Sequence, residues 1–161
     1  MARWPADRLL GAVPSVSAWS PGGHLHHLSA INAQVLGSLL RALEGDDVLT
    51  PGGSPTWIGR LLLGLGRLPR GKGRAPKRFH PPDDLTPESV AQVLAEARRS
   101  LDAIGPHLGR LAALDGRMTH SLLGRFDAVE WLRFARIHTA HHLRIARDVE
   151  TRRAASLQTT A

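Results

Sequence analysis

The sequence contains no cysteine and no tyrosine, and only 4% of its 161 residues are aromatic. Without cysteine, the chain can form neither a disulfide nor a thiolate metal site, and it cannot use a cysteine nucleophile. The scarcity of aromatic residues disfavours a stacking platform for single-stranded nucleic acid. Histidine, by contrast, occurs nine times.

Long apolar runs are also missing. The N-terminal stretch has no apolar segment of the kind found in secretory signal peptides. The longest apolar run, residues 57–68, is interrupted by arginine and falls well short of the ~20 residues that span a bilayer. We therefore expect a cytoplasmic protein without a membrane partner. Abundant Ala, Leu, Arg and Gly are typical of GC-rich bacterial genomes.

The chain is basic, with a net charge of +7 and a pI near 11.4. A basic chain raises the question of nucleic-acid binding. The arginines are spread along the whole chain, which favours a solvated basic surface over a specific nucleic-acid site. Any binding to DNA should accordingly be weak and lost at moderate salt.

Four segments have the 3.6-residue periodicity of helices, and none has convincing strand alternation. The first begins at the N-cap Ser20 with Pro21 in its first turn and runs to about Leu43. The second covers residues 55–68 and is weakened by three glycines. The Pro- and Gly-rich residues 69–84 predict a long surface loop, which is either functional or mobile.

The third helix begins with the cap Thr86 and runs to about Leu114, with a kink or break at Gly105-Pro106. The fourth begins with the N-cap Asp127, for which Glu130 completes a capping box. It continues to about residue 152 and precedes a flexible tail from about residue 153. Four helices around one core predict a single all-α domain with four-helix-bundle architecture. The tryptophans expected to be core anchors are Trp19 and Trp131.

The last helix carries three histidines within five residues. His138 and His142 lie one turn apart in the middle of its apolar stripe, His141 lies at the edge, and the arginines lie opposite. Such an i, i+4 pair can direct two nitrogens to one metal ion. Two core histidines with separate hydrogen-bond partners are the alternative.

The first helix offers a third ligand. His24 lies within the apolar half of this helix, His27 lies at its margin, and His26 points away and should be exposed. Periodicity alone slightly favours His24. Before the last helix, His120 either lines the mouth of the site or makes local hydrogen bonds within its loop.

Two blocks carry a family resemblance. The stretch WSPGGHLHHLSAINAQVL resembles the opening of the DinB/YfiT-like superfamily, in which a His-Leu pair follows a Trp-Ser pair and a helix start. That histidine lies eight residues after the tryptophan, and counting from Trp19 it is His27. The stretch HSLLGRFDAVEWLRFARIHTAHHLR is similar to a subgroup of unknown function with a Gly-x-[Leu/Phe] turn and a final HxxHHLR motif.

The resemblance implies an up-down-down-up four-helix bundle with a divalent metal near one end. The ligands carried over are His27, His138 and His142, with water completing the shell. Imidazole ligands suit Zn, Ni, Fe and Cu. Zn or Ni is the first candidate, and Fe, Mn and Cu are the further candidates. Many relatives have Gln three residues after the last ligand, where this chain has Ile145. This difference bears on the substrate pocket and on any specific activity, and it leaves the three ligands unchanged.

The resemblance also implies a function. Some relatives are S-transferases or isomerases that depend on a low-molecular-weight thiol such as bacillithiol or mycothiol. A metal-dependent transferase or hydrolase-like enzyme acting on an unknown small molecule is therefore expected. The alternative is a non-catalytic, stress-related or binding bundle with a structural metal or none. The sequence leaves a homodimer open.

Overall fold

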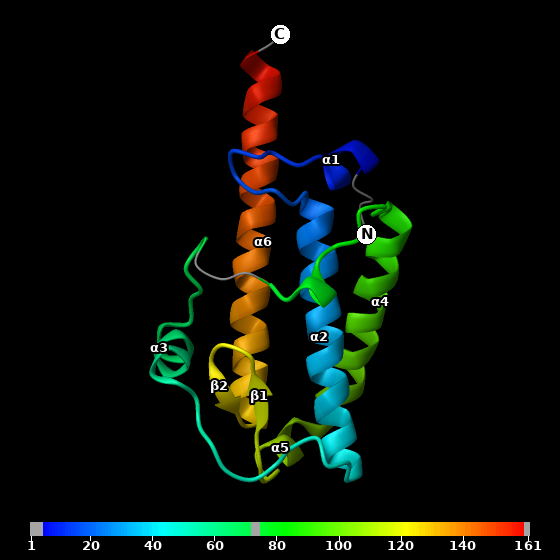
Figure 1. Cartoon of the computed structure of the whole chain (residues 1–161). Helices are drawn as coiled ribbons and strands as arrows, with labels where there is room; N and C mark the ends of the chain where they lie inside the picture. Colours follow the sequence, from blue (N-terminus) through cyan, green and yellow to red (C-terminus); the bar gives the residue numbers. More distant parts are fainter. Residues whose placement is uncertain (1–4, 72–74, 160–161) are drawn as a thin grey trace.

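The structure is a computed structural model, and it describes residues 5–71 and 75–159. Within these ranges the chain is predominantly helical, which confirms the all-α expectation (Figure 1). The α-helices are α1 (Ala6–Leu10), α2 (Pro21–Glu44), α3 (Trp57–Leu65), α4 (Pro87–Ile104), α5 (Leu108–Leu111) and α6 (Ala128–Thr159). The shorter elements are the 3-10 turns η1 (Lys77–Phe79) and η2 (Gly105–His107) and the strands β1 (Met118–His120) and β2 (Gly124–Phe126).

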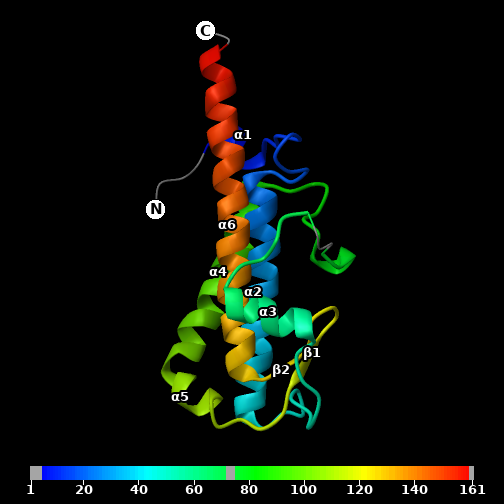
Figure 2. The same cartoon turned by 90° about the vertical axis from the view of Figure 1, so that its left-hand side faces the viewer.

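Three long helices form the body of the bundle. Helix α2 lies between α4 and α6 and packs extensively against both. In Figure 1, α2 and α4 run in one direction and α6 runs in the other. These three helices match the last three positions of the expected up-down-down-up order. Helix α2 therefore takes the second position, with the short α1 before it, although it is the first of the four predicted helices. Helix α3 lies across α6 (Figures 1 and 2).

The predicted caps explain where the long helices begin. The Ser20 side chain accepts a hydrogen bond of 3.0 Å from the backbone N–H three residues later. Thr86 and Ser89 bond each other's backbone N–H groups, each at 3.1 Å. Asp127 and Glu130 form the predicted capping box, with reciprocal bonds of 3.0 and 2.8 Å.

Several helices end at residues other than those predicted. Helix α4 ends at Ile104 because Pro106 lacks a backbone N–H, and the predicted extension to Leu114 becomes η2 and α5. Helix α3 is shorter than predicted because Gly66, with φ of 64°, ends it. Helix α6 continues to Thr159 instead of ending near residue 152. Its last turns contain Ala, Leu and Gln, which favour the helix over the predicted tail.

The β1–β2 hairpin was not predicted. It pairs Met118 with Phe126 and His120 with Gly124, and strands of three residues are too short to show alternation. Gly124 has φ of +89°, and a Cβ there would lie 2.6 Å from both the Ser54 carbonyl oxygen and the Thr56 nitrogen. The Gly-x-Phe motif is therefore a structural turn that lets the hairpin approach the backbone before α3.

Alanine at Gly124 should lower the free energy of unfolding by about 2 kcal/mol or more, because it combines a strained positive φ with a backbone clash. Gly37→Ala is the matched control, since Gly37 lies inside α2 and its Cβ would meet nothing within 4 Å. That change should stabilise the protein by about 0.5–1 kcal/mol. Urea unfolding of both variants measures the difference, and equal stabilities would contradict this account of the hairpin.

The apolar core fills the end of the bundle at which α6 begins. Leu39, Ile104 and Phe126 are completely buried there, and half of the cluster comes from the hairpin region and the first turns of α6. Trp131 is the predicted core anchor, and its indole N–H donates to the Met118 carbonyl at 3.2 Å. The metal-binding candidates on α6 come immediately after this core. No helix in the described ranges combines the length and hydropathy needed to cross a membrane.

Candidate metal centre

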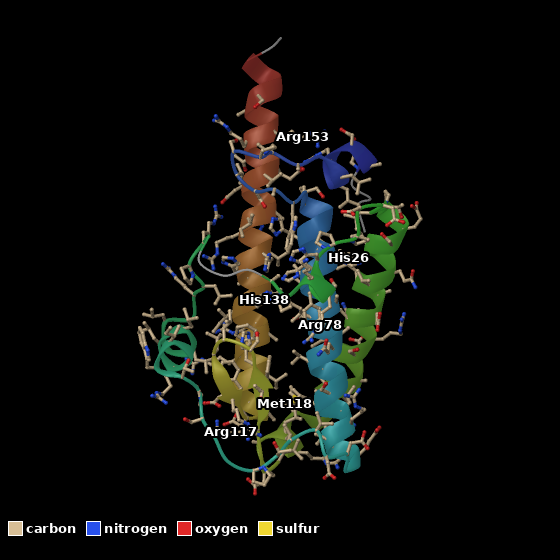
Figure 3. The ribbon with its side chains drawn as sticks, in the orientation of Figure 1. His26, Arg78, Arg117, Met118, His138 and Arg153 are labelled. Carbon is tan, nitrogen blue, oxygen red and sulfur yellow. The ribbon has the colours of Figure 1, made fainter. Side chains whose placement is uncertain are left out.

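The fold brings the three predicted ligands together. His27 comes from α2, and His138 and His142 come from successive turns of α6. One potential ligand atom from each lies within 4.8 Å of the others, and each residue is at most 9% exposed. Figure 3 shows His138 between α6 and α2. The alternative of two core histidines with separate partners does not describe this cluster.

The nitrogen positions suit a common ligand. The Nε2 atoms of His138 and His142 are 3.1 Å apart. Two imidazole nitrogens bound tetrahedrally to one zinc ion at ~2.0–2.1 Å would be about 3.3 Å apart. His27 donates from Nδ1 to the Phe79 carbonyl at 2.8 Å, which fixes its tautomer and leaves the Nε2 lone pair available. The donor set therefore fits a divalent ion that prefers imidazole.

His24 is next to the cluster but on its outer side. Its Nδ1 lies 2.9 Å from Nδ1 of His142, and its Nε2 lies 2.9 Å from Oγ of Ser17. It thus contacts the His142 nitrogen opposite the one that faces His138. A hydrogen bond to the second nitrogen of a ligating imidazole sets its tautomer and holds its ring in place. His24 thus lies outside the clustered group, at a position from which it can orient the His142 ring, although periodicity slightly favoured it as a ligand.

His24→Ala should reduce metal affinity by about 10–100-fold without abolishing binding, because the His142 ring loses its support. His24→Asn keeps a side chain that hydrogen-bonds and should recover part of the loss. Competition with a chromophoric chelator measures the affinity of both variants. A complete loss in His24→Ala together with full binding in His27→Ala would make His24 the ligand.

Trp19 covers the histidines and is not the core anchor that we predicted. It is half-buried, and its ring centroid lies 5.0 Å from that of His27 and 6.4 Å from that of His142. His80 lies in the loop before α4, and its ring centroid is 5.5 Å from that of Trp19. Because Phe79 in the same loop accepts the His27 hydrogen bond, this loop helps to build the site, which favours the functional alternative for it.

Burial keeps the cluster neutral. Desolvation, reinforced by the neighbouring His27, lowers the pKa of His138 to about 3. Desolvation and the same neighbour lower the pKa of His24 to about 4. Desolvation also lowers the pKa of His142 and His27. Metal ions bind the neutral imidazole, so the cluster is in its binding form at neutral pH.

Three other histidines lie around this group. The Nδ1 atom of His120 accepts the backbone N–H of Leu122 at 3.2 Å and that of Leu123 at 3.3 Å, so the local-loop alternative describes it. His141 is half-buried and its ring lies beside that of His142, with centroids 5.1 Å apart. His26 is half-buried and not exposed as predicted, and its Nδ1 is buried without a hydrogen-bond partner among the described residues.

Comparison with protein families identifies the superfamily of the chain. A family model described as the DinB superfamily matches residues 2–146, which include all three clustered histidines. The chain belongs to the DinB superfamily. Searches of curated proteins and of solved structures gave no significant match.

Proposed function

We propose that this DinB-superfamily protein binds one divalent metal ion through His27, His138 and His142 and is a metal-dependent transferase that uses a low-molecular-weight thiol. The supporting observation is the group of three buried imidazoles whose potential ligand atoms lie within 4.8 Å of one another. Zn and Ni are the first candidates for the ion, followed by Fe, Mn and Cu. The thiol comes from the family resemblance, with bacillithiol and mycothiol as examples.

The chain's own residues contribute binding, orientation and exclusion of water. When bound, a divalent ion with three protein ligands and one open position lowers the pKa of a coordinated water or thiol. The Phe79 carbonyl and His24 hold the rings of His27 and His142 in place. Trp19 shields the cluster, and the buried Ile145 stands where many relatives have Gln.

The burial of the cluster favours a second candidate, a non-catalytic bundle with a structural metal. All three ligands are at most 9% exposed, and Trp19 lies over two of them. Structural zinc sites are closed, whereas catalytic sites keep an exchangeable position. The two functions therefore differ in whether a small thiol reaches the ion.

Cobalt substitution separates these functions. Protein loaded with Co²⁺ should show visible absorption bands that shift when a small thiol is added, because the thiol enters the open position. A thiol-conjugation assay with simple electrophiles then tests transfer, with His138→Ala as the inactive control. If the bands do not change at saturating thiol and no conjugation occurs, the site is structural. If the freshly purified protein also contains no stoichiometric metal, the whole proposal fails.

A further inference from the structure

The net charge of the chain belongs to one segment. Residues 48–82 contain seven of the 21 Lys and Arg residues and neither Asp nor Glu. The remaining 14 cationic residues equal the 14 acidic residues in number, so they cancel, and the net charge of +7 belongs to this segment. Arginine is spread along the whole chain, but the acidic residues that balance its charge are missing from residues 48–82. The basic surface is therefore less uniform than the composition indicates.

Helix α3 lies in the middle of this segment and exposes an apolar face. Gly59 and Leu63 face the protein and are buried. On the opposite side, Trp57 is 69% exposed, Leu61 is 49% exposed and Leu65 is 63% exposed. A surface helix normally places polar residues on its outward face. Large apolar side chains gathered there are typical of an interaction site.

Cationic side chains flank this apolar face. Arg60 lies on α3 itself, and Arg67 follows its C-terminus; both are exposed. Arg70 is also exposed and pairs with Asp148 of α6. Figure 2 shows α3 on the outer side of α6, facing the viewer. The apolar residues and the cations are thus presented on the outside of the bundle.

We propose that α3 is a docking surface for an anionic lipid bilayer. Trp57, Leu61 and Leu65 enter the boundary between headgroups and acyl chains, while Arg60 and Arg67 contact lipid phosphates. Helices that lie on membranes combine an apolar face rich in Trp and Leu with flanking Lys and Arg. The expectation of no membrane partner rested on the lack of a spanning segment, and a helix bound at the surface does not need one.

Charge and side-chain chemistry favour lipid over two other partners. A symmetric dimer through α3 would bring the same patch of both copies together, so the exposed Arg60 and Arg67 of the two copies would repel each other. Nucleic-acid interfaces rely on cations and polar contacts to phosphate and have no use for exposed Leu61 and Leu65. An anionic bilayer accommodates both the cations and the leucines.

Vesicle co-sedimentation of the full chain tests the proposal. Vesicles of phosphatidylcholine with roughly one-third phosphatidylglycerol are compared with pure phosphatidylcholine vesicles at about 0.1 M salt. Binding should be at least about tenfold tighter to the anionic vesicles and should weaken as salt is raised. The His138→Ala variant should bind them like the wild type, because the docking surface does not depend on the metal centre.

Two matched double variants locate the contact. Trp57→Ser with Leu61→Ser should reduce binding to the anionic vesicles by about tenfold or more, since it removes the apolar insertion. Leu101→Ser with Leu108→Ser is the control, because these side chains are 54% and 53% exposed and lie on α4 and α5. This control should bind like the wild type. Circular dichroism checks that both double variants keep their helices.

Several results would overturn the lipid proposal. Wild-type protein that binds neither vesicle type, or both types equally, would exclude recognition of an anionic surface. An equal loss of binding in both double variants would show that α3 has no special role. Sedimentation that shows a wild-type dimer, together with a monomeric Trp57→Ser, Leu61→Ser variant, would assign the face to a second copy. Vesicle binding that duplex DNA displaces, and that the α3 variant retains in full, would assign the charge to nucleic acid.

Discussion

Alanine at His138 should abolish stoichiometric metal binding at neutral pH. The Nε2 atom of His138 lies 3.1 Å from that of His142, so both imidazoles approach the same point. Loss of a group that merely orients a ligand costs about 10–100-fold in affinity, and removal of a ligand should exceed that loss. The same result is expected for His27→Ala and His142→Ala. Elemental analysis of freshly purified protein and chelator competition measure the effect.

Two neighbouring histidines provide matched controls. His26 and His141 flank the ligands in sequence, are half-buried and lie outside the clustered group. Alanine at either position should leave the stoichiometry at one metal per chain. Unchanged helicity by circular dichroism shows that a loss in the ligand variants is not due to unfolding. If His141→Ala removes the metal as completely as His138→Ala does, the assigned ligand group is wrong.

The sequence predicted the long helices because their signals are local. Capping side chains act on backbone groups three residues away, so Ser20, Thr86 and Asp127 mark helix starts that the structure confirms. Short elements, in contrast, depend on distant partners. The hairpin exists because Gly124 fits against the backbone of residues 54–56, and no pattern within three-residue strands reveals that contact. The direction of each helix likewise depends on the path of the connecting loops, and contacts with distant parts of the chain determine that path.

The ligands of the candidate site could be predicted because side-chain type and spacing identify them. His138 and His142 share a face of one helix, and the Trp-Ser spacing favoured His27, which the structure places beside them. The supporting contacts were missed for physical reasons. Phe79 accepts the His27 hydrogen bond with its backbone carbonyl, and the identity of its side chain does not indicate this contact. Ser17 contacts His24 within an irregular segment that has no periodicity.

The metal-free protein should lose stability steeply in mild acid. The pKa of His138 is lowered from 6.5 to about 3 and that of His24 to about 4, chiefly by burial. Between these values and 6.5, the unfolded chain binds protons that the folded chain excludes, so the free energy of unfolding falls as pH falls. The full contribution is present above pH 6.5. From pH 6.5 to pH 5, each of these two histidines should cost about 1.6 kcal/mol.

Urea unfolding at a series of pH values, with chelator present, measures this dependence. His138→Gln removes one titrating imidazole and keeps a polar side chain of similar length. Its mean slope of free energy against pH between pH 6.5 and pH 5 should be lower than that of the wild type by about 1.1 kcal/mol per pH unit. His80→Gln, at an exposed histidine, is the matched control. Wild-type stability that stays constant from pH 7 to pH 5, or equal slope changes in the two variants, would show that the buried cluster does not exclude protons. The folded chain would then bind these protons as readily as the unfolded chain, and burial of the histidines would not explain any sensitivity to acid.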